Sequence, residues 1–180
     1  MNLDAIVTQL RAYAPIFNTN VAGAAQFDEA VSGQTWMPAP AAYVVPMPQE
    51  ATENLSRTGL KQVITDRIGV CVLIDSSADR RGQAAAGQVI TIRAAIFAAL
   101  LNWHIDPTRS TQGMYFGGAR AMDFDRARLF WQFDFCLDEQ FTDADGFQLP
   151  PGVPLVEFDK TYKTPAGKTL AVQHVLTPHS

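Results

Sequence analysis

The first third of the chain contains two stretches with the apolar spacing of an amphipathic helix. Apolar residues recur every three or four positions over residues 3–10, behind the capping residue Asn2 and before the helix breaker Pro15. A second, shorter helix is predicted over residues 22–31, with Gly33 closing it.

The strongest helical pattern runs over residues 84–103 and carries apolar residues on two adjacent stripes. The first stripe is Val89, Ile92, Ile96, Leu100 and Trp103, and the second is Ile90, Ala94, Phe97 and Leu101. A helix that packs on a sheet by one side needs only one such stripe. We therefore expect this helix to be buried against a sheet and also against a second surface, either the N-terminal helix or a neighbouring subunit.

Four segments have the composition or alternation of β-strands. The run 41–45 is enclosed by prolines, which indicates a sheet edge or a strand that ends abruptly. Residues 61–75 end in an unbroken apolar run, as in a strand covered on both faces. Residues 113–124, kinked at Gly117-Gly118, precede residues 128–141, in which apolar and polar residues alternate. These last two segments predict a hairpin whose second strand is half-buried.

The order helix, helix, strand, strand, long helix, strand, strand predicts an α+β fold, a mostly antiparallel sheet packed on one face by helices. We expect this domain to cover residues 1–141, with a polar arm at 47–60 and a polar turn at 76–82. Residues 142–180 are proline-rich and have only short apolar pieces. They predict an extended C-terminal segment with one or two short strands, either appended to the domain or part of it.

Composition and charge narrow the class of function. The 180 residues include 14 Lys and Arg against 18 Asp and Glu, a net charge of -4. Duplex binding requires clustered basic residues, and here the tightest pair is Arg80-Arg81, so nucleic-acid binding is not expected as the main role. No apolar run approaches the ~20 residues that span a bilayer, and the N-terminus lacks the features of a signal peptide. We expect a soluble cytoplasmic protein whose Cys71 and Cys136 are buried free thiols.

Two stretches that resemble ligand-binding motifs fail on spacing. Gly167-Lys168-Thr169 resembles the end of a phosphate-binding loop, but the earlier glycine of that motif would fall at Tyr162. Asp143-x-Asp145-Gly146 resembles part of a calcium loop, but its first and last ligands would be Phe141 and Gly152. Both stretches are predicted to be turns.

No set of residues has the spacing of a catalytic site. His104, His174 and His179 do not form a zinc-binding pair, and His104 is expected to cap the long helix or to lie at the surface. Asp123 and Asp125 are expected at a charged hairpin tip. We predict no catalytic residue, no cofactor and no metal.

Short pieces of sequence, in a particular order, carry a resemblance to a known family. The pieces are DAIVTQLRAYAP, AAQFDEAV, PAAYVVPM with the polar arm after it, IGVCVLIDSSADRRGQAA leading into the helix that ends ALLNW, and GGARAMDFDRARLFWQFDF. Over residues 1–141 the chain resembles the phage tail terminator family, including its minor tail protein U-like members. The family implies a virion protein with a sheet covered by helices. It implies a ring, typically a hexamer, that caps the tail tube, stops its polymerisation and presents a surface to the head connector.

The partners that this resemblance implies are copies of the chain, the tail tube protein and the head connector, with DNA passing through the lumen of the ring. We predict that four cations contact the tube or the connector, or face the lumen: Arg57, Lys61, Arg80 and Arg81. The 142–180 segment is a candidate for joining subunits by adding a strand to a neighbour's sheet. Two other functions stay open, a head–tail connector or stopper subunit and a small cytoplasmic ligand-binding module.

Overall fold

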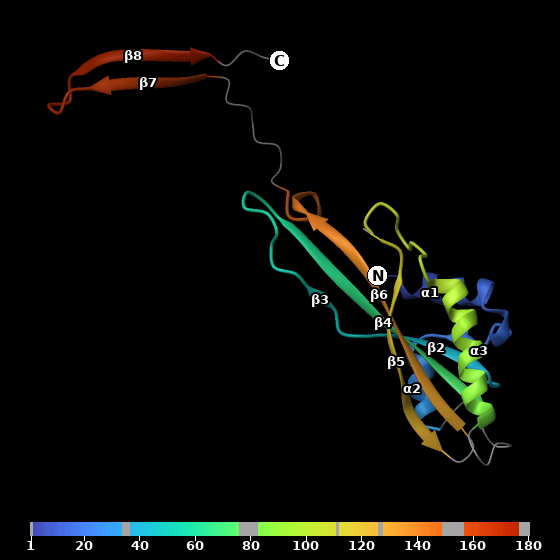
Figure 1. The fold of residues 1–180 in the computed structure, drawn as a ribbon. Coiled ribbons are helices and arrows are strands. Elements are labelled where there is room, and N and C mark those ends of the chain that lie inside the picture. Colours follow the sequence, from blue (N-terminus) through green and yellow to red (C-terminus); the bar gives the residue numbers. More distant parts are fainter. Residues whose placement is uncertain are drawn as a thin grey trace. The chain divides into compact units, whose positions relative to one another are not determined.

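In a computed structural model the chain divides into two units, Met1–Asp145 and Gly146–Ser180. The structure describes residues 2–33, 37–75, 83–110, 112–125, 128–148 and 157–176. Helices and a mostly antiparallel sheet make up the first unit, which confirms the predicted α+β class (Figure 1).

Two long antiparallel strands form the centre of the first unit. β4 (Lys61–Asp75) and β6 (Arg128–Thr142) pair along their whole length without a register shift. The other strands of this sheet are β1 (Val21–Ala22), β2 (Ala41–Pro46), β3 (Glu50–Ala51) and β5 (Tyr115–Asp125). The strand order is β1-β2-β4-β6-β5, with β3 also paired to β4, and only the β1–β2 pair is parallel within the described residues.

Two helices and a short 3₁₀ turn pack on one face of this sheet. They are α1 (Leu3–Tyr13), η1 (Pro15–Phe17) and α3 (Gln83–Leu100) (Figure 1). Asn2 caps α1 as predicted, since its Oδ1 accepts a hydrogen bond from the amide of Ala5 at 3.2 Å. The buried side chains of the core on this face are at most 2% exposed, and they include Ile6, Leu10, Ile68, Val70, Val72, Ile96, Leu100, Phe133 and Phe135.

The remaining helix, α2 (Ala24–Val31), packs against the opposite face of the sheet. The centroid of its Phe27 ring lies 5.6 Å from that of Tyr43 and 6.2 Å from that of Phe130. Successive strand residues point to opposite faces, and β2 accordingly places Ala42 in the α1–α3 core and Tyr43 in the α2 cluster. The structure thus adds a helix on the second face to the predicted arrangement.

The prediction of a half-buried second strand in the hairpin is wrong, because both faces of β6 are largely covered. On its polar side Gln132 and Cys136 are each only 3% exposed. Arg120 donates to Gln132 Oε1 at 3.3 Å, while Gln132 Nε2 lies 2.5 Å from Asp134 Oδ1 and 3.3 Å from Met47 Sδ. Polar groups tolerate burial when they have partners, and these partners come from β5 and from the segment after β2.

The outer strand β5 is irregular, as the Gly117-Gly118 pair predicts. Its register to β6 shifts between Phe116 and Gly118 and again between Ala121 and Asp123. Gly118 has φ 144°, a backbone conformation that favours glycine. The kink is therefore confirmed, and a second irregularity accompanies it.

The second unit contains an antiparallel hairpin of β7 (Glu157–Lys163) and β8 (Thr169–Leu176). The turn between them is closed by a hydrogen bond from the amide of Thr164 to the carbonyl of Lys168 at 2.8 Å. This confirms that Gly167-Lys168-Thr169 belongs to a turn between two short strands.

Gly113 occupies a position where a side chain has no space. A Cβ there would lie 2.5 Å from the carbonyl carbon of Asn102, in the segment that joins α3 to β5. We expect Gly113→Ala to lower the free energy of unfolding by about 1–3 kcal/mol, because backbone must move to admit the methyl group. Urea denaturation of the purified protein measures this change.

Gly87 in α3 provides the matched control, since a Cβ at that position meets no atom within 4 Å. Gly87→Ala should raise the free energy of unfolding by up to about 1 kcal/mol, the difference in helix propensity between the two residues. Equal destabilisation by both variants would contradict the proposed close approach at Gly113.

Candidate docking surfaces

The second apolar stripe of α3 lies at the surface of the first unit. Residues of the first stripe such as Ile92 and Ile96 are at most 1% exposed, whereas Ile90 is 60% and Leu101 38% exposed. α1 packs beside α3, where Gln9 Nε2 donates to the carbonyl of Ala99 at 3.0 Å, and this contact leaves the second stripe open. The N-terminal helix is therefore a second partner of α3, as the sequence predicts, but it does not cover Ile90 or Leu101.

The exposed stripe continues onto the outer strand of the sheet. The ring of Phe97 lies 5.0 Å from that of Phe116 in β5, and Phe116, which is 37% exposed, lies 5.9 Å from the buried Phe135. Arg93 places its guanidinium 5.9 Å from the centroid of Phe97. We call this patch the α3–β5 surface, and its apolar members are Ile90, Ala94, Phe97, Leu101 and Phe116.

The polar segment 47–60 is an arm that lies along β4. Backbone hydrogen bonds tie it down, from Met47 N to Arg67 O at 3.0 Å and from Thr52 N to Val63 O at 2.9 Å. The pairing of β3 with β4 lies between these two bonds. The segment predicted as a loop is therefore ordered by backbone hydrogen bonds to one edge of β4.

The end of the arm, residues 54–60, is a loop tied by its own side chains. Asn54 donates to the carbonyl of Gly59 at 2.8 Å and accepts from the amide of Lys61 at 2.9 Å. Asp143 accepts from the amide of Leu60 at 2.7 Å. We call residues 54–61 the arm loop; these hydrogen bonds tie it at several points although most of it is exposed.

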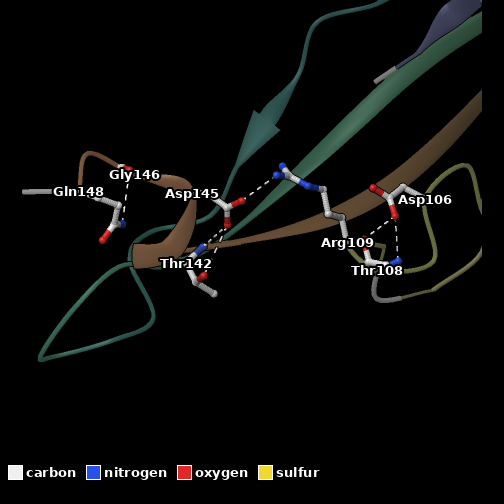
Figure 2. Close-up of polar contacts among 7 residues, drawn as sticks. All are labelled: Asp106, Thr108, Arg109, Thr142, Asp145, Gly146 and Gln148. Atoms are coloured by element: carbon white, nitrogen blue, oxygen red, sulfur yellow. Dashed lines mark hydrogen bonds and ion pairs between the residues drawn. The ribbon is translucent and has the colours of Figure 1, made fainter. Parts of the chain in front are cut away.

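The turn η2 (Asp143–Asp145) links the arm loop to the loop before β5. Asp145 accepts from the amide of Thr142 at 3.0 Å and forms an ion pair with Arg109 at 2.9 Å (Figure 2). The Arg109 guanidinium also lies 5.5 Å from the ring centroid of Phe141. The predicted turn at this acidic stretch is confirmed, and its carboxylates hold neighbouring segments.

The loop that supplies Arg109 is itself braced by a carboxylate. Asp106 accepts from the amide of Thr108 at 2.9 Å and from its hydroxyl at 2.6 Å (Figure 2). These hydrogen bonds to the charged form hold the pKa of Asp106 below its ordinary value. Within the described ranges, no group of three or more His, Cys, Asp or Glu is placed to hold a metal ion.

Two of the four predicted contact residues fall in the described structure, and both belong to the arm loop. Arg57 and Lys61 are exposed there, whereas Arg80 and Arg81 lie outside the described residues. The prediction from sequence missed Leu55, which is 60% exposed beside Arg57. An isolated leucine in a polar arm was the only signal for it.

The residues tested for chemistry have structural roles where the structure describes them. His104 does not cap α3: the helix is followed by Asn102 with φ 59°, and His104 Nδ1 lies 3.2 Å from Ser110 Oγ. Cys71 and Cys136 are free and buried, as predicted, and burial raises the pKa of Cys71 to about 12. In the backbone register Asp125 lies opposite Arg128 at the end of the β5–β6 hairpin. No helix in the described part of the chain is long and apolar enough to cross a membrane.

An open apolar surface on a core helix and a rigid exposed arm are typical of proteins that assemble with other proteins. The family model for phage tail terminator proteins matches residues 1–144, and the chain belongs to this family. It is a structural, tail-capping protein of a phage-type tail, and its family is not an enzyme family.

The chain was also compared with solved structures and with curated proteins. A chain in the structure described as the virion of a native gene transfer agent particle is 22% identical, with a TM-score of 0.48, and the match covers 77% of this chain and 94% of that chain. No match was found among curated proteins.

Asp143→Ala tests whether η2 orders the arm loop. Loss of the carboxylate removes the hydrogen bond to Leu60, so we expect hydrogen exchange at the Leu60 amide to rise roughly 5- to 10-fold. Hydrogen exchange read by NMR or mass spectrometry measures the change. Asp28 is also an exposed aspartate, but it lies in α2. Asp28→Ala therefore serves as the control and should leave the arm loop unchanged. Equal exchange in both variants would mean that the arm loop holds its conformation without η2.

Proposed function

We propose that this protein caps the tail tube as a ring of identical subunits, six in number as is typical of the family. The ring stops tube polymerisation and presents a face to the head connector, with DNA passing through its lumen. Subunits made in the host cytoplasm assemble onto the tail and stay at the head–tail junction of the virion. Family membership over residues 1–144 supports the capping role.

The exposure of the α3–β5 surface is the observation that supports a ring. A closed ring needs a heterologous interface, in which one patch of each subunit meets a different patch of the next. Ile90, Leu101 and Phe116 are each more than a third exposed, and burying such a side chain contributes about 1.5–3 kcal/mol when it is complete. A neighbouring copy that covers this surface removes it from water permanently.

The arm loop supports a separate contact with the tube or the connector. Its internal hydrogen bonds restrict it, so less conformational entropy is lost on docking than for a loop without them. Arg57 and Lys61 offer positive charge on a chain whose net charge is -4, and Leu55 offers an apolar contact beside them. We assign the same role to Arg80 and Arg81, which follow β4 in the sequence.

Charge reversal in the arm loop tests its role in capping. We expect Arg57→Glu with Lys61→Glu to leave the melting temperature within a few degrees of the parent, since both side chains are exposed. Tube capping should fall at least tenfold, a loss of about 1.4 kcal/mol or more in binding. Negative-stain microscopy of tail tubes polymerised with each variant measures the tube length. Tubes polymerised with the double variant should grow without a defined maximum length.

Glu53→Lys changes the charge of the same arm next to the arm loop and is the matched control, expected to cap normally. Tubes of normal length with the double variant would remove the arm loop from the tube contact. Co-purification of the wild-type protein with connector protein but never with tube protein would instead favour a connector or stopper subunit.

A charge on the α3–β5 surface tests the ring. Ile90→Asp places a carboxylate at an exposed apolar position, so the isolated subunit should fold normally while ring assembly is lost. Mass measurement by light scattering or native mass spectrometry, with tube ends present, should give monomers. Gln88→Asp, at an exposed position of the same helix outside the α3–β5 surface, should assemble as the parent does. A ring of unchanged mass with Ile90→Asp would contradict this interface.

A further inference from the structure

The β7–β8 hairpin needs a partner to be stable. An isolated two-stranded hairpin is marginally stable in water, because one pair of strands cannot bury enough apolar surface. The described part of the second unit adds no third strand and no helix to this pair. Its strands are nevertheless seven and eight residues long, which is long for a hairpin without a core.

The register makes one row of positions on this hairpin more apolar than the other. Phe158 pairs with Val175 and Tyr162 pairs with Ala171 on this row, with the polar pair Lys160–Gln173 between them, because positions two apart along a strand share a face. β8 reads TLAVQHVL and contains no Asp, Glu, Lys or Arg, whereas β7 reads EFDKTYK and carries four charged residues. An uncharged edge strand such as β8 is prone to pair with other strands unless something covers it.

The first unit offers a matching apolar surface but a poor edge for strand addition. β5 is the outer strand of the sheet, and its two register shifts interrupt the regular backbone pattern that an added strand requires. The α3–β5 surface beside it is open, with Ile90 60% and Phe116 37% exposed. Packing of apolar faces therefore fits this region better than the addition of a strand to β5.

We propose that the β7–β8 hairpin of one copy covers the α3–β5 surface of the next copy in the ring. This inference rests on the proposed ring and names the segment that closes it. The chain between Asp145 and Glu157 can span at most about 40 Å, whereas a domain of this size has a radius of gyration of about 15 Å. The hairpin can thus reach beyond its own domain. Each copy donates its hairpin in the same rotational sense, which closes a heterologous ring.

Engineered cysteines on separate full-length chains test this contact. One chain, with an affinity tag, carries Ala94→Cys on the α3–β5 surface, and an untagged chain carries Ala171→Cys on the more apolar row of β8. The two are mixed, assembled with tail tubes and oxidised with copper phenanthroline. The native thiols do not compete, since both are buried and the raised pKa of Cys71 leaves almost no thiolate at pH 8.

We expect a tagged–untagged disulfide dimer, because this pairing is possible only between copies. Val172→Cys is the matched control, since it is adjacent in β8 but lies on the opposite row. Its yield should be lower by on the order of tenfold, because a disulfide tolerates only a narrow range of Cβ geometry.

Three results would overturn the inference. A ring that assembles but gives no such dimer, or gives equal yields for the two β8 positions, removes the hairpin contact and leaves the proposed function intact. A third chain is made that carries both Ala94→Cys and Ala171→Cys; if it forms its disulfide only within itself, the hairpin covers its own domain. The wild-type chain failing to form any ring with tail tubes removes the proposed ring and this contact together.

Discussion

The continuous pairing of β4 with β6 is the constraint on which the rest of the first unit depends. Because strand residues alternate between faces, a slip of one residue would exchange the apolar and polar sides of the whole sheet. The observed register places Val70 and Val72 under α1 and α3, and it places Cys71 and Gln132 together on the other side. The same two strands run beyond β2 and β5 at one end, where the arm lies on β4 and η2 follows β6. The α3–β5 surface and the arm loop are thereby both supported by the β4–β6 strand pair.

Much of this fold follows from the sequence because its signals are local. The cap at Asn2, the two stripes of α3 and the kink at Gly117-Gly118 each depend on neighbours along the chain, and the structure contains all three.

The predictions that failed share a different cause. Gln132 sits on the polar side of a strand, and its burial depends on Arg120 and Met47, which are distant in sequence. The position of α2 depends likewise on the second face of β2, and the two residues of β3 carry no strand pattern of their own. In the candidate site, the sequence predicts Arg57 and Lys61 as contact residues from their charge and place, but the hydrogen bonds of Asn54 and Asp143 in the arm loop appear only in three dimensions.

A subunit with an open apolar surface must stay folded and soluble until it meets its partner. Three features limit the exposure of the α3–β5 surface. Arg93 lies over the ring of Phe97 and keeps a charge beside the apolar stripe. Phe116 is held against Phe97 and Phe135, so only part of its ring is open. The register shifts of β5 disfavour pairing of this edge with strands of other molecules. The surface is thus available to a partner of matching shape while it resists indiscriminate strand addition.

The two surfaces differ in chemistry in the way that their proposed partners differ. Interfaces between permanent identical subunits are more apolar than contacts made with other proteins, because they need never dissociate. The α3–β5 surface is apolar and includes residues of the core helix α3, which suits the permanent contact proposed with the next copy. The arm loop is polar, charged and ordered by hydrogen bonds of its own, so it can remain in water until the tube or the connector arrives. In the proposed ring the two surfaces therefore have separate tasks: apolar closure would stabilise the ring, and the polar arm would decide where the ring docks.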